Sequence, residues 1–306
     1  MRPLIAAISA SLPKTPTFPI LATMTLPPTD TMKDIEPTVL RLWQDAKLDF
    51  CAALGTPQGL AFLGVILAYP FHRWLLSERV GIVPGAWLHG PMMTGKSRTA
   101  QAAACFYWPP DLHPVVTPES AHLQLPRTLA RHPGLPVTFE ASSYSPLAVE
   151  TIATLRLSSH GIMDRGITGC TIGSKGDCSP PLIVSDETTT DSPTASRYLH
   201  FSPIPDSSRP YQDIIRHREC FPAITAACFD NSVFLRLLID GILQESGNYI
   251  HGPTLNGRQA CLLTTAWAIF CAVDALIGGG ESDSILLKAW LCEHGIALWS
   301  RDLAIA

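Results

Sequence analysis

The residues with the clearest chemical purpose form one short run from Gly90 to Ser97. Its letters, GPMMTGKS, match the pattern G-x-x-x-x-G-K-[ST] in full, between a short apolar run at 86–88 and a predicted helix at 96–106. Glycines let such a loop curl until its backbone N–H groups converge on a phosphate, and the N-terminus of the following helix adds about half a positive charge. The loop therefore predicts an ATP site, with the candidate contact residues Gly90, Pro91, Met92, Met93, Thr94, Gly95, Lys96, Ser97 and Arg98.

Two residues of this loop have specific expected roles. The ammonium group of Lys96 would reach the β- and γ-phosphates, and the hydroxyl of Ser97 would be a ligand of Mg²⁺. Hydrolysis further requires an acid that helps to hold Mg²⁺ and a carboxylate that aligns the attacking water. The sequence places such acids at the ends of two predicted strands.

The two candidate strands end differently. The run Leu135–Glu140 ends in a single acid, Glu140, which Ala141 follows, whereas the run 182–187 ends in the pair Asp186-Glu187. Taken alone, the second strand looks more like the one that holds the metal. A solvated carboxylate at a strand end is common, so both assignments stay open at this point.

Composition and length restrict the class of protein. The chain has 306 residues, of which 46% are hydrophobic and 16% charged, so it can bury a large core and is not disordered throughout. Its formal net charge of −4 excludes a generally basic nucleic-acid coat but leaves room for a local DNA-binding surface. Nine scattered cysteines without a Cys-x-x-Cys pair are typical of reduced core residues in a cytoplasmic protein.

No membrane span is expected. The apolar run 59–69 is shorter than the ~20 residues that cross a bilayer, and the run 260–277 contains Thr264, Thr265 and Asp274. Both runs instead suit buried helices.

The chain divides into three predicted parts: a flexible, Pro/Thr-rich lead at 1–37, an α/β core with N-terminal helices at 38–229, and a helical C-terminal subdomain at 230–306. Apolar spacing predicts helices over 38–54 and 59–68, and long helical periods at 233–245, 258–277 and 284–299. In the centre, short apolar runs bounded by Gly, Pro and Ser indicate buried strands. These runs lie at 135–139, 147–157, 167–172, 181–185 and 198–201.

The approach to the loop, Phe71-His72-Arg73-Trp74-Leu75-Leu76, resembles that of plasmid and phage replication ATPases, the helicase-like domains related to superfamily-three helicases and AAA+ proteins. The resemblance covers about residues 55–300. It implies that Leu135–Glu140 is the Walker B strand and that Pro181–Glu187 is the following sensor strand. Arg197, ahead of the run 198–201, resembles the arginine that such ATPases use as a finger in a neighbouring subunit. Arg258 to Trp267 and Trp290 resemble the C-terminal helices of the group.

The chain departs from the family pattern at Ala141, where the family would have the second acid of an Asp-Glu pair. Glu140 could still hold Mg²⁺, but Asp186 or Glu187 would have to supply the water-aligning carboxylate. The departure keeps open a nucleotide-binding regulatory module that hydrolyses poorly. A small-molecule kinase is a third possibility, with the stretch Arg209–Arg218 as its lid.

Two further stretches have weaker functional interpretations. The basic cluster Arg209, Arg216, His217 and Arg218 could touch a DNA backbone, although small clusters are usually solvated. The glycine-containing stretch from Gly161 to Gly176, with Arg165, Gly166 and Lys175, could be a pore hairpin or only a loop. The histidines at 89, 113, 122, 132, 160 and 200 are not spaced as metal ligands usually are, and we expect them to lie in the core or on the surface.

The expected fold is thus a three-layer α/β P-loop domain with a mainly parallel central sheet, a helical lead-in and a helical C-terminal subdomain. The expected function is Mg²⁺-dependent ATP hydrolysis that drives work on DNA, with Lys96, Glu140, Asp186, Glu187 and Arg197 as catalytic candidates and Ser97 and Glu140 as metal ligands. The expected assembly is a homo-oligomeric ring, with DNA and a primase or origin-binding protein as possible partners.

Overall fold

A computed structural model describes eleven segments of the chain, interrupted by gaps. They are 34–79, 81–109, 111–141, 149–161, 178–186, 192–204, 221–245, 250–251, 257–279, 281–293 and 296–297.

A five-stranded, all-parallel sheet forms the centre of the molecule. Its strands are β1 (Ala86–His89), β2 (Val115–Val116), β3 (Thr138–Glu140), β4 (Leu182–Ser185) and β5 (Leu199–Phe201), in the order β2-β3-β4-β1-β5. Trp87 pairs with Ile183 on one side and with His200 on the other, so β1 lies between β4 and β5. The strands are short apolar runs whose side chains point alternately to the two faces, which suits a sheet covered on both sides.

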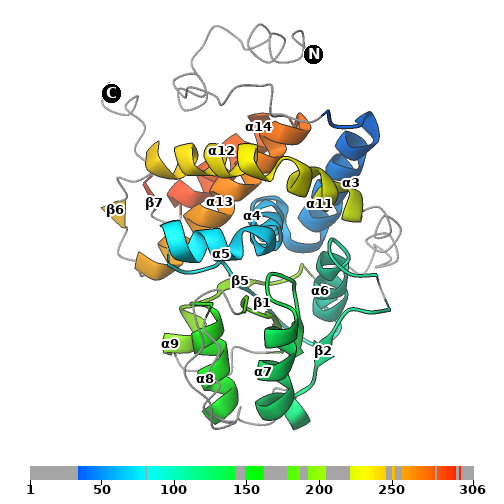
Figure 1. Cartoon of the computed structure of the whole chain (residues 1–306), viewed down its shortest axis with the longest axis vertical. Coiled ribbons are helices and arrows are strands. Elements are labelled where there is room, and N and C mark those ends of the chain that lie inside the picture. Colours follow the sequence, from blue (N-terminus) through cyan, green and yellow to red (C-terminus); the bar gives the residue numbers. More distant parts are fainter. Residues whose placement is uncertain are drawn as a thin grey trace, which may run out of the picture.

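Helices cover both faces and make three layers (Figure 1). On one face, α7 (Ala121–Arg131) and α8 (Val149–Ser158) pack through Leu125 and Leu155 onto a cluster that includes Trp87, Phe139 and Ile183. The alternate strand residues, among them Leu88 and Val184, belong to a larger apolar cluster on the other face. The predicted three-layer fold with a parallel central sheet is therefore confirmed.

The larger cluster joins helices from both ends of the chain. Its helices are α3 (Pro37–Leu54), α4 (Thr56–Leu67), α5 (His72–Trp74), α6 (Lys96–Ala104), α11 (Phe221–Asp230), α12 (Ser232–Glu245), α13 (Gly257–Ile277) and α14 (Glu281–Glu293). Among the described elements are also single helical turns at Tyr69–Phe71, Leu75–Arg79 and Pro118–Ser120, the short helix α9 (Ser192–Ala195), and a pair of antiparallel strands, β6 (Ile250–His251) and β7 (Ile296–Ala297). One continuous core thus spans the predicted boundary between 229 and 230, whose position remains a prediction.

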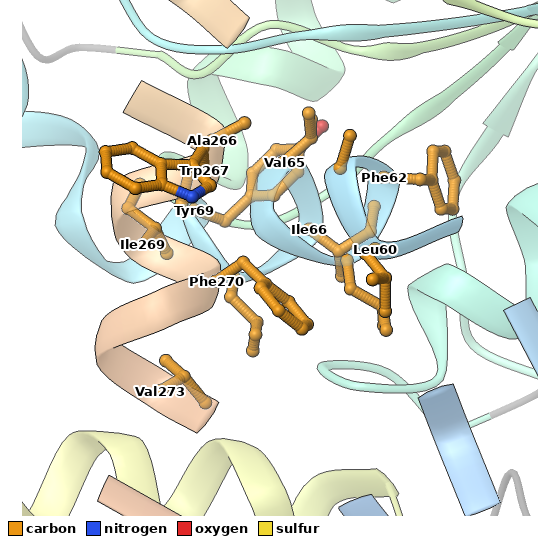
Figure 2. Close-up of a cluster of buried hydrophobic side chains, with 14 of the residues drawn as sticks. Leu60, Phe62, Val65, Ile66, Tyr69, Ala266, Trp267, Ile269, Phe270 and Val273 are labelled. Carbon is orange, nitrogen blue, oxygen red and sulfur yellow. The ribbon is translucent and has the colours of Figure 1, made fainter. Parts of the chain in front are cut away.

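Helix α4 lies at the centre of this core and packs against both α3 and α13. Figure 2 shows its buried side chains beside those of α13. Every residue from Gly59 to Leu67 is buried. Two glycines permit the close packing: a Cβ on Gly59 would lie 2.6 Å from the carbonyl oxygen of Phe50 in α3, and a Cβ on Gly64 would lie 2.0 Å from that of Ala266 in α13. The predicted helices at 38–54 and 59–68 are confirmed as α3 and α4.

Two of the sequence-based element predictions are wrong. The run 147–157 was expected to be a strand, but Val149–Ser158 is the helix α8, which has Thr151, Thr154 and Leu155 on its buried side. The buried residues are spaced three and four apart, as in a helix, whereas the prediction relied on the shortness of the apolar run. The predicted helix at 284–299 ends at Glu293, and Ile296–Ala297 pairs with β6 instead. The predicted strand at 167–172 lies outside the described residues.

One described helix is long and apolar enough to cross a membrane by composition. The window Arg258–Ile277 has a mean hydropathy of 2.0, but 89% of it is buried inside the protein. This burial is typical of a core helix in a globular domain.

Candidate functional site

The Gly90–Ser97 loop connects β1 to α6 at the carboxyl edge of the parallel sheet. Gly90 and Gly95 have φ angles of 144° and 90°, a region that side chains rarely adopt, so both positions favour glycine. Helix α6 begins at Lys96 directly after Gly95, whose carbonyl oxygen accepts the Thr99 N–H at 2.9 Å. The Thr94 hydroxyl donates to the Pro91 carbonyl at 3.0 Å and closes the turn. The positive φ angles thus explain why glycine stands at these two positions of the loop.

Met93 is the residue of the described chain that has a left-handed backbone without being glycine, with φ of 64°. Met93 is 94% exposed and Met92 is 66% exposed, so both residues stand at the rim of the loop. Because a left-handed backbone costs an L-residue about 1–2 kcal/mol, Met93 stores strain in the loop.

Met93→Gly is therefore expected to stabilise the protein by up to about 1 kcal/mol, because glycine removes the strain and little packing is lost. Thermal unfolding measures the effect. Met92→Gly is the matched control, since Met92 has no left-handed backbone and should gain nothing. An equal change in both variants would contradict the assignment of strain to Met93.

Lys96 is folded back into the loop. Its side chain is 7% exposed, and its Nζ donates to the carbonyl oxygens of Gly90 at 2.7 Å and Pro91 at 2.6 Å. The same Nζ forms an ion pair with Asp186 Oδ1 at 3.0 Å. The ammonium group thus stands at the sheet edge, surrounded by oxygen atoms.

A cavity of about 470 Å³ opens above this edge. Its lining combines the loop with the ends of β3 and β4: Met92, Met93, Gly95, Lys96, Ser97, Arg98, Glu140, Ala141, Val184, Ser185 and Asp186. The structure therefore brings most of the predicted site residues into one place, although they come from three separate parts of the chain.

The strand order explains how two acids reach the same cavity. Strand β4 lies next to β1, and β3 lies beyond it, with Glu140 paired to Val184. Strand β4, from the run 182–187, therefore lies beside the loop strand, and β3, which ends at Glu140, lies one strand further out. Backbone bonds from Ala141 N to Val184 O (2.7 Å) and from Gly90 N to Asp186 O (3.3 Å) hold the three strand ends level.

Two acids, Glu140 and Asp186, line the cavity. Glu140 is half-buried and Asp186 has a side-chain exposure of 33%, so both carboxylates reach the cavity while keeping contact with solvent. Ala141, at 8% exposure, packs in the apolar cluster beneath α7 and α8. Among the described acids, Asp186 is the one that forms an ion pair with Lys96.

The side chains in this cavity suit a hard divalent cation. Ser97 is exposed at the first turn of α6, and its hydroxyl shares the cavity with the carboxylates of Glu140 and Asp186. Hydroxyl and carboxylate oxygens are the ligands that Mg²⁺ takes, usually with retained waters and phosphate oxygens. The donor set therefore fits Mg²⁺.

Other predicted residues lie elsewhere. Arg197 precedes β5, at the opposite end of that strand from the cavity, is half-buried and donates from Nη1 to the Pro193 carbonyl. Glu187, the basic cluster Arg209–Arg218 and the residues from 162 to 177, including Arg165, Gly166, Lys175 and Gly176, lie outside the described residues. Gly161 lies in a turn after α8.

Sequence reasoning missed a polar network beneath the loop. Trp87 donates from Nε1 to Ser185 Oγ at 2.7 Å and stacks on His200 with ring centroids 5.4 Å apart. His89, the last residue of β1, meets His200 edge-on at 5.5 Å. Burial, with smaller effects from His200 and Lys96, lowers the pKa of His89 below its ordinary value. Trp87 and His89 are two residues apart in β1, and this spacing in the sequence could have indicated that they share a face of the sheet.

Comparisons with known proteins add one finding. No protein-family model matches the chain, and no curated protein matches it. A solved structure titled SCCmec type IV Cch, an active helicase, is similar, with 13% sequence identity and a TM-score of 0.52. The chain shares this helicase's fold. The match covers 83% of this chain and 50% of the helicase chain, so this chain spans about half of the helicase's length.

Proposed function

We propose that the chain binds ATP with Mg²⁺ at the Gly90–Ser97 loop and hydrolyses it to drive work on DNA. The observation that carries the proposal is the convergence of Lys96, Ser97, Glu140 and Asp186 in one cavity beside a glycine-shaped loop. Phosphate binding at the N-terminus of a helix after a parallel strand follows from the loop's N–H groups and the helix dipole. Likeness in fold to an active helicase supports the same direction.

Each residue has a proposed role in positioning charge. Lys96 binds the β- and γ-phosphates once it leaves its present oxygen partners, which are Gly90 O, Pro91 O and Asp186 Oδ1. Ser97 and Glu140 hold Mg²⁺. The cation would neutralise charge that develops on the phosphates during transfer. Asp186 orients the attacking water, because Ala141 provides no carboxylate.

The proposed setting is replication of a plasmid, phage or mobile element, in a homo-oligomeric ring in the cytoplasm that acts with a primase or origin-binding protein. In such a ring Arg197 would complete the site of a neighbouring subunit. Its position away from its own cavity is compatible with a role in trans.

A second candidate function is a regulatory module that binds ATP without rapid turnover. The specific observation in its favour is Ala141, which is packed in the core where the resembling ATPases carry an acid. The kinase alternative depends on a lid at 209–218, which lies outside the described residues.

An ATPase assay with and without single-stranded DNA separates these functions. The proposal predicts Mg²⁺-dependent hydrolysis that single-stranded DNA stimulates, and a loss of about a hundredfold or more in turnover for Glu140→Gln. Glu150→Gln, on an exposed position of α8, is the matched control and should leave turnover unchanged. ATP binding without turnover in either condition would favour the regulatory module. Turnover that DNA leaves unchanged would contradict the DNA role.

A further inference from the structure

The hydrogen-bonding capacity of the Lys96 ammonium group is fully used in the structure. An ammonium group has three N–H donors, and three oxygens accept from it: Gly90 O, Pro91 O and Asp186 Oδ1. A phosphate can therefore bind Lys96 only by displacing at least one of these oxygens.

Asp186 differs from the other two acceptors because it carries a charge. Among the described residues it is the carboxylate that forms an ion pair with Lys96. A phosphate that takes Lys96 from Asp186 breaks this ion pair and places several further negative charges near the carboxylate. Glu140 adds a second carboxylate to the same cavity. Like charges that share one cavity repel more strongly where the protein partly excludes water than they do in bulk solvent.

A divalent cation carried by the nucleotide changes this balance. The cation reduces the negative charge of the entering nucleotide by two, and carboxylate oxygens are among the ligands that such a cation prefers. Asp186 would then contact this cation, directly or through a water, as the ion pair with Lys96 breaks, and the cation would offset the repulsion between the carboxylate and the phosphates.

We propose that Asp186 makes this site select the cation-bound nucleotide over the free nucleotide polyanion. The proposal rests on the proposed nucleotide binding and adds a specificity determinant to it. The Asp186 carboxylate stays paired with Lys96 until a ligand that brings its own cation binds. The proposal therefore predicts that free nucleotide competes poorly with the cation-bound nucleotide at this site.

Equilibrium binding of a fluorescent ATP analogue, in EDTA and in excess Mg²⁺, tests this role without any measurement of activity. Wild type should bind much more tightly in Mg²⁺ than in EDTA. Asp186→Asn should tighten binding in EDTA by about tenfold, which corresponds to about 1.4 kcal/mol, and change binding in Mg²⁺ far less. Asp186→Glu keeps the charge and should retain the wild-type preference for Mg²⁺. Asp186→Ser, a second neutral variant, should behave like Asp186→Asn.

The outcomes separate the two proposals. If wild type binds the analogue in Mg²⁺ and the neutral variants fail to bind more tightly in EDTA, the role of Asp186 is wrong while nucleotide binding stands. Equal tightening in EDTA and Mg²⁺ would also contradict selection, since the charge would then oppose every nucleotide alike. If wild type binds under neither condition, the proposed function itself fails.

Discussion

Gly64→Leu is expected to prevent stable folding. Even a Cβ at this position would lie 2.0 Å from the carbonyl oxygen and 2.7 Å from the carbonyl carbon of Ala266, and both atoms are backbone that no rotamer change can move. The side chain would therefore push α4 away from α13 along the centre of the core (Figure 2). We expect a loss of more than about 4 kcal/mol in the free energy of unfolding, against a total of about 5–15 kcal/mol for a typical domain.

Circular dichroism and denaturant unfolding measure this effect. Gly64→Ala is the mildest version and should lower stability less than leucine does, although it still meets the Ala266 backbone. Ala130→Leu adds a similar volume at an exposed position of α7 and should be nearly neutral. A stably folded Gly64→Leu protein would show that α4 and α13 do not pack as closely as described.

Asp274→Ala is expected to have the second largest effect on stability, about 3 kcal/mol. Asp274 Oδ1 in α13 accepts hydrogen bonds from Trp43 Nε1 at 2.7 Å and from Lys47 Nζ at 2.9 Å, both in α3. The Lys47 and Asp274 side chains are only 5% and 3% exposed, so neither can turn to water. Burial opposes the charge on Lys47, but the carboxylates of Asp274 and Asp283 together hold its pKa above the ordinary value. Removal of Asp274 leaves a buried ammonium with Asp283 of α14 as its remaining charged partner.

A double variant tests this explanation. Lys47→Met in the Asp274→Ala background should recover part of the lost stability, because it removes the buried charge that the first substitution left poorly paired. Asp111→Ala, at an exposed position, is the control for loss of a carboxylate and should change little. A double variant that is less stable than Asp274→Ala alone would contradict the electrostatic account.

The loop and its helix were predictable because their signal is local. The pattern from Gly90 to Ser97 specifies both the turn and the start of α6, and the apolar periods of α3, α4 and α13 specify their lengths. The parallel sheet followed from short apolar runs with helices between them. These features depend on residues that lie close together in the chain.

Features that depend on distant residues were not predictable. Nothing in the runs 135–140 and 182–187 states which lies beside β1, since pairing is decided by how the crossover helices pack. The bond between Lys47 and Asp274 joins residues 227 apart. Asp186 was expected near the phosphates, but its ion pair with Lys96 emerges only when β4 is placed next to β1.

The central claim is that the Gly90–Ser97 loop binds a nucleotide through Lys96. Equilibrium binding of a fluorescent ATP analogue in Mg²⁺ to wild type, Lys96→Ala and Arg127→Ala tests it most directly, with Arg127 as an exposed cation on α7. Lys96→Ala should keep its fold and lose about a hundredfold or more in affinity, which corresponds to about 2.7 kcal/mol. Arg127→Ala should bind as wild type does. Equal affinity of Lys96→Ala and wild type would contradict the account, because the loop would then not hold the phosphates.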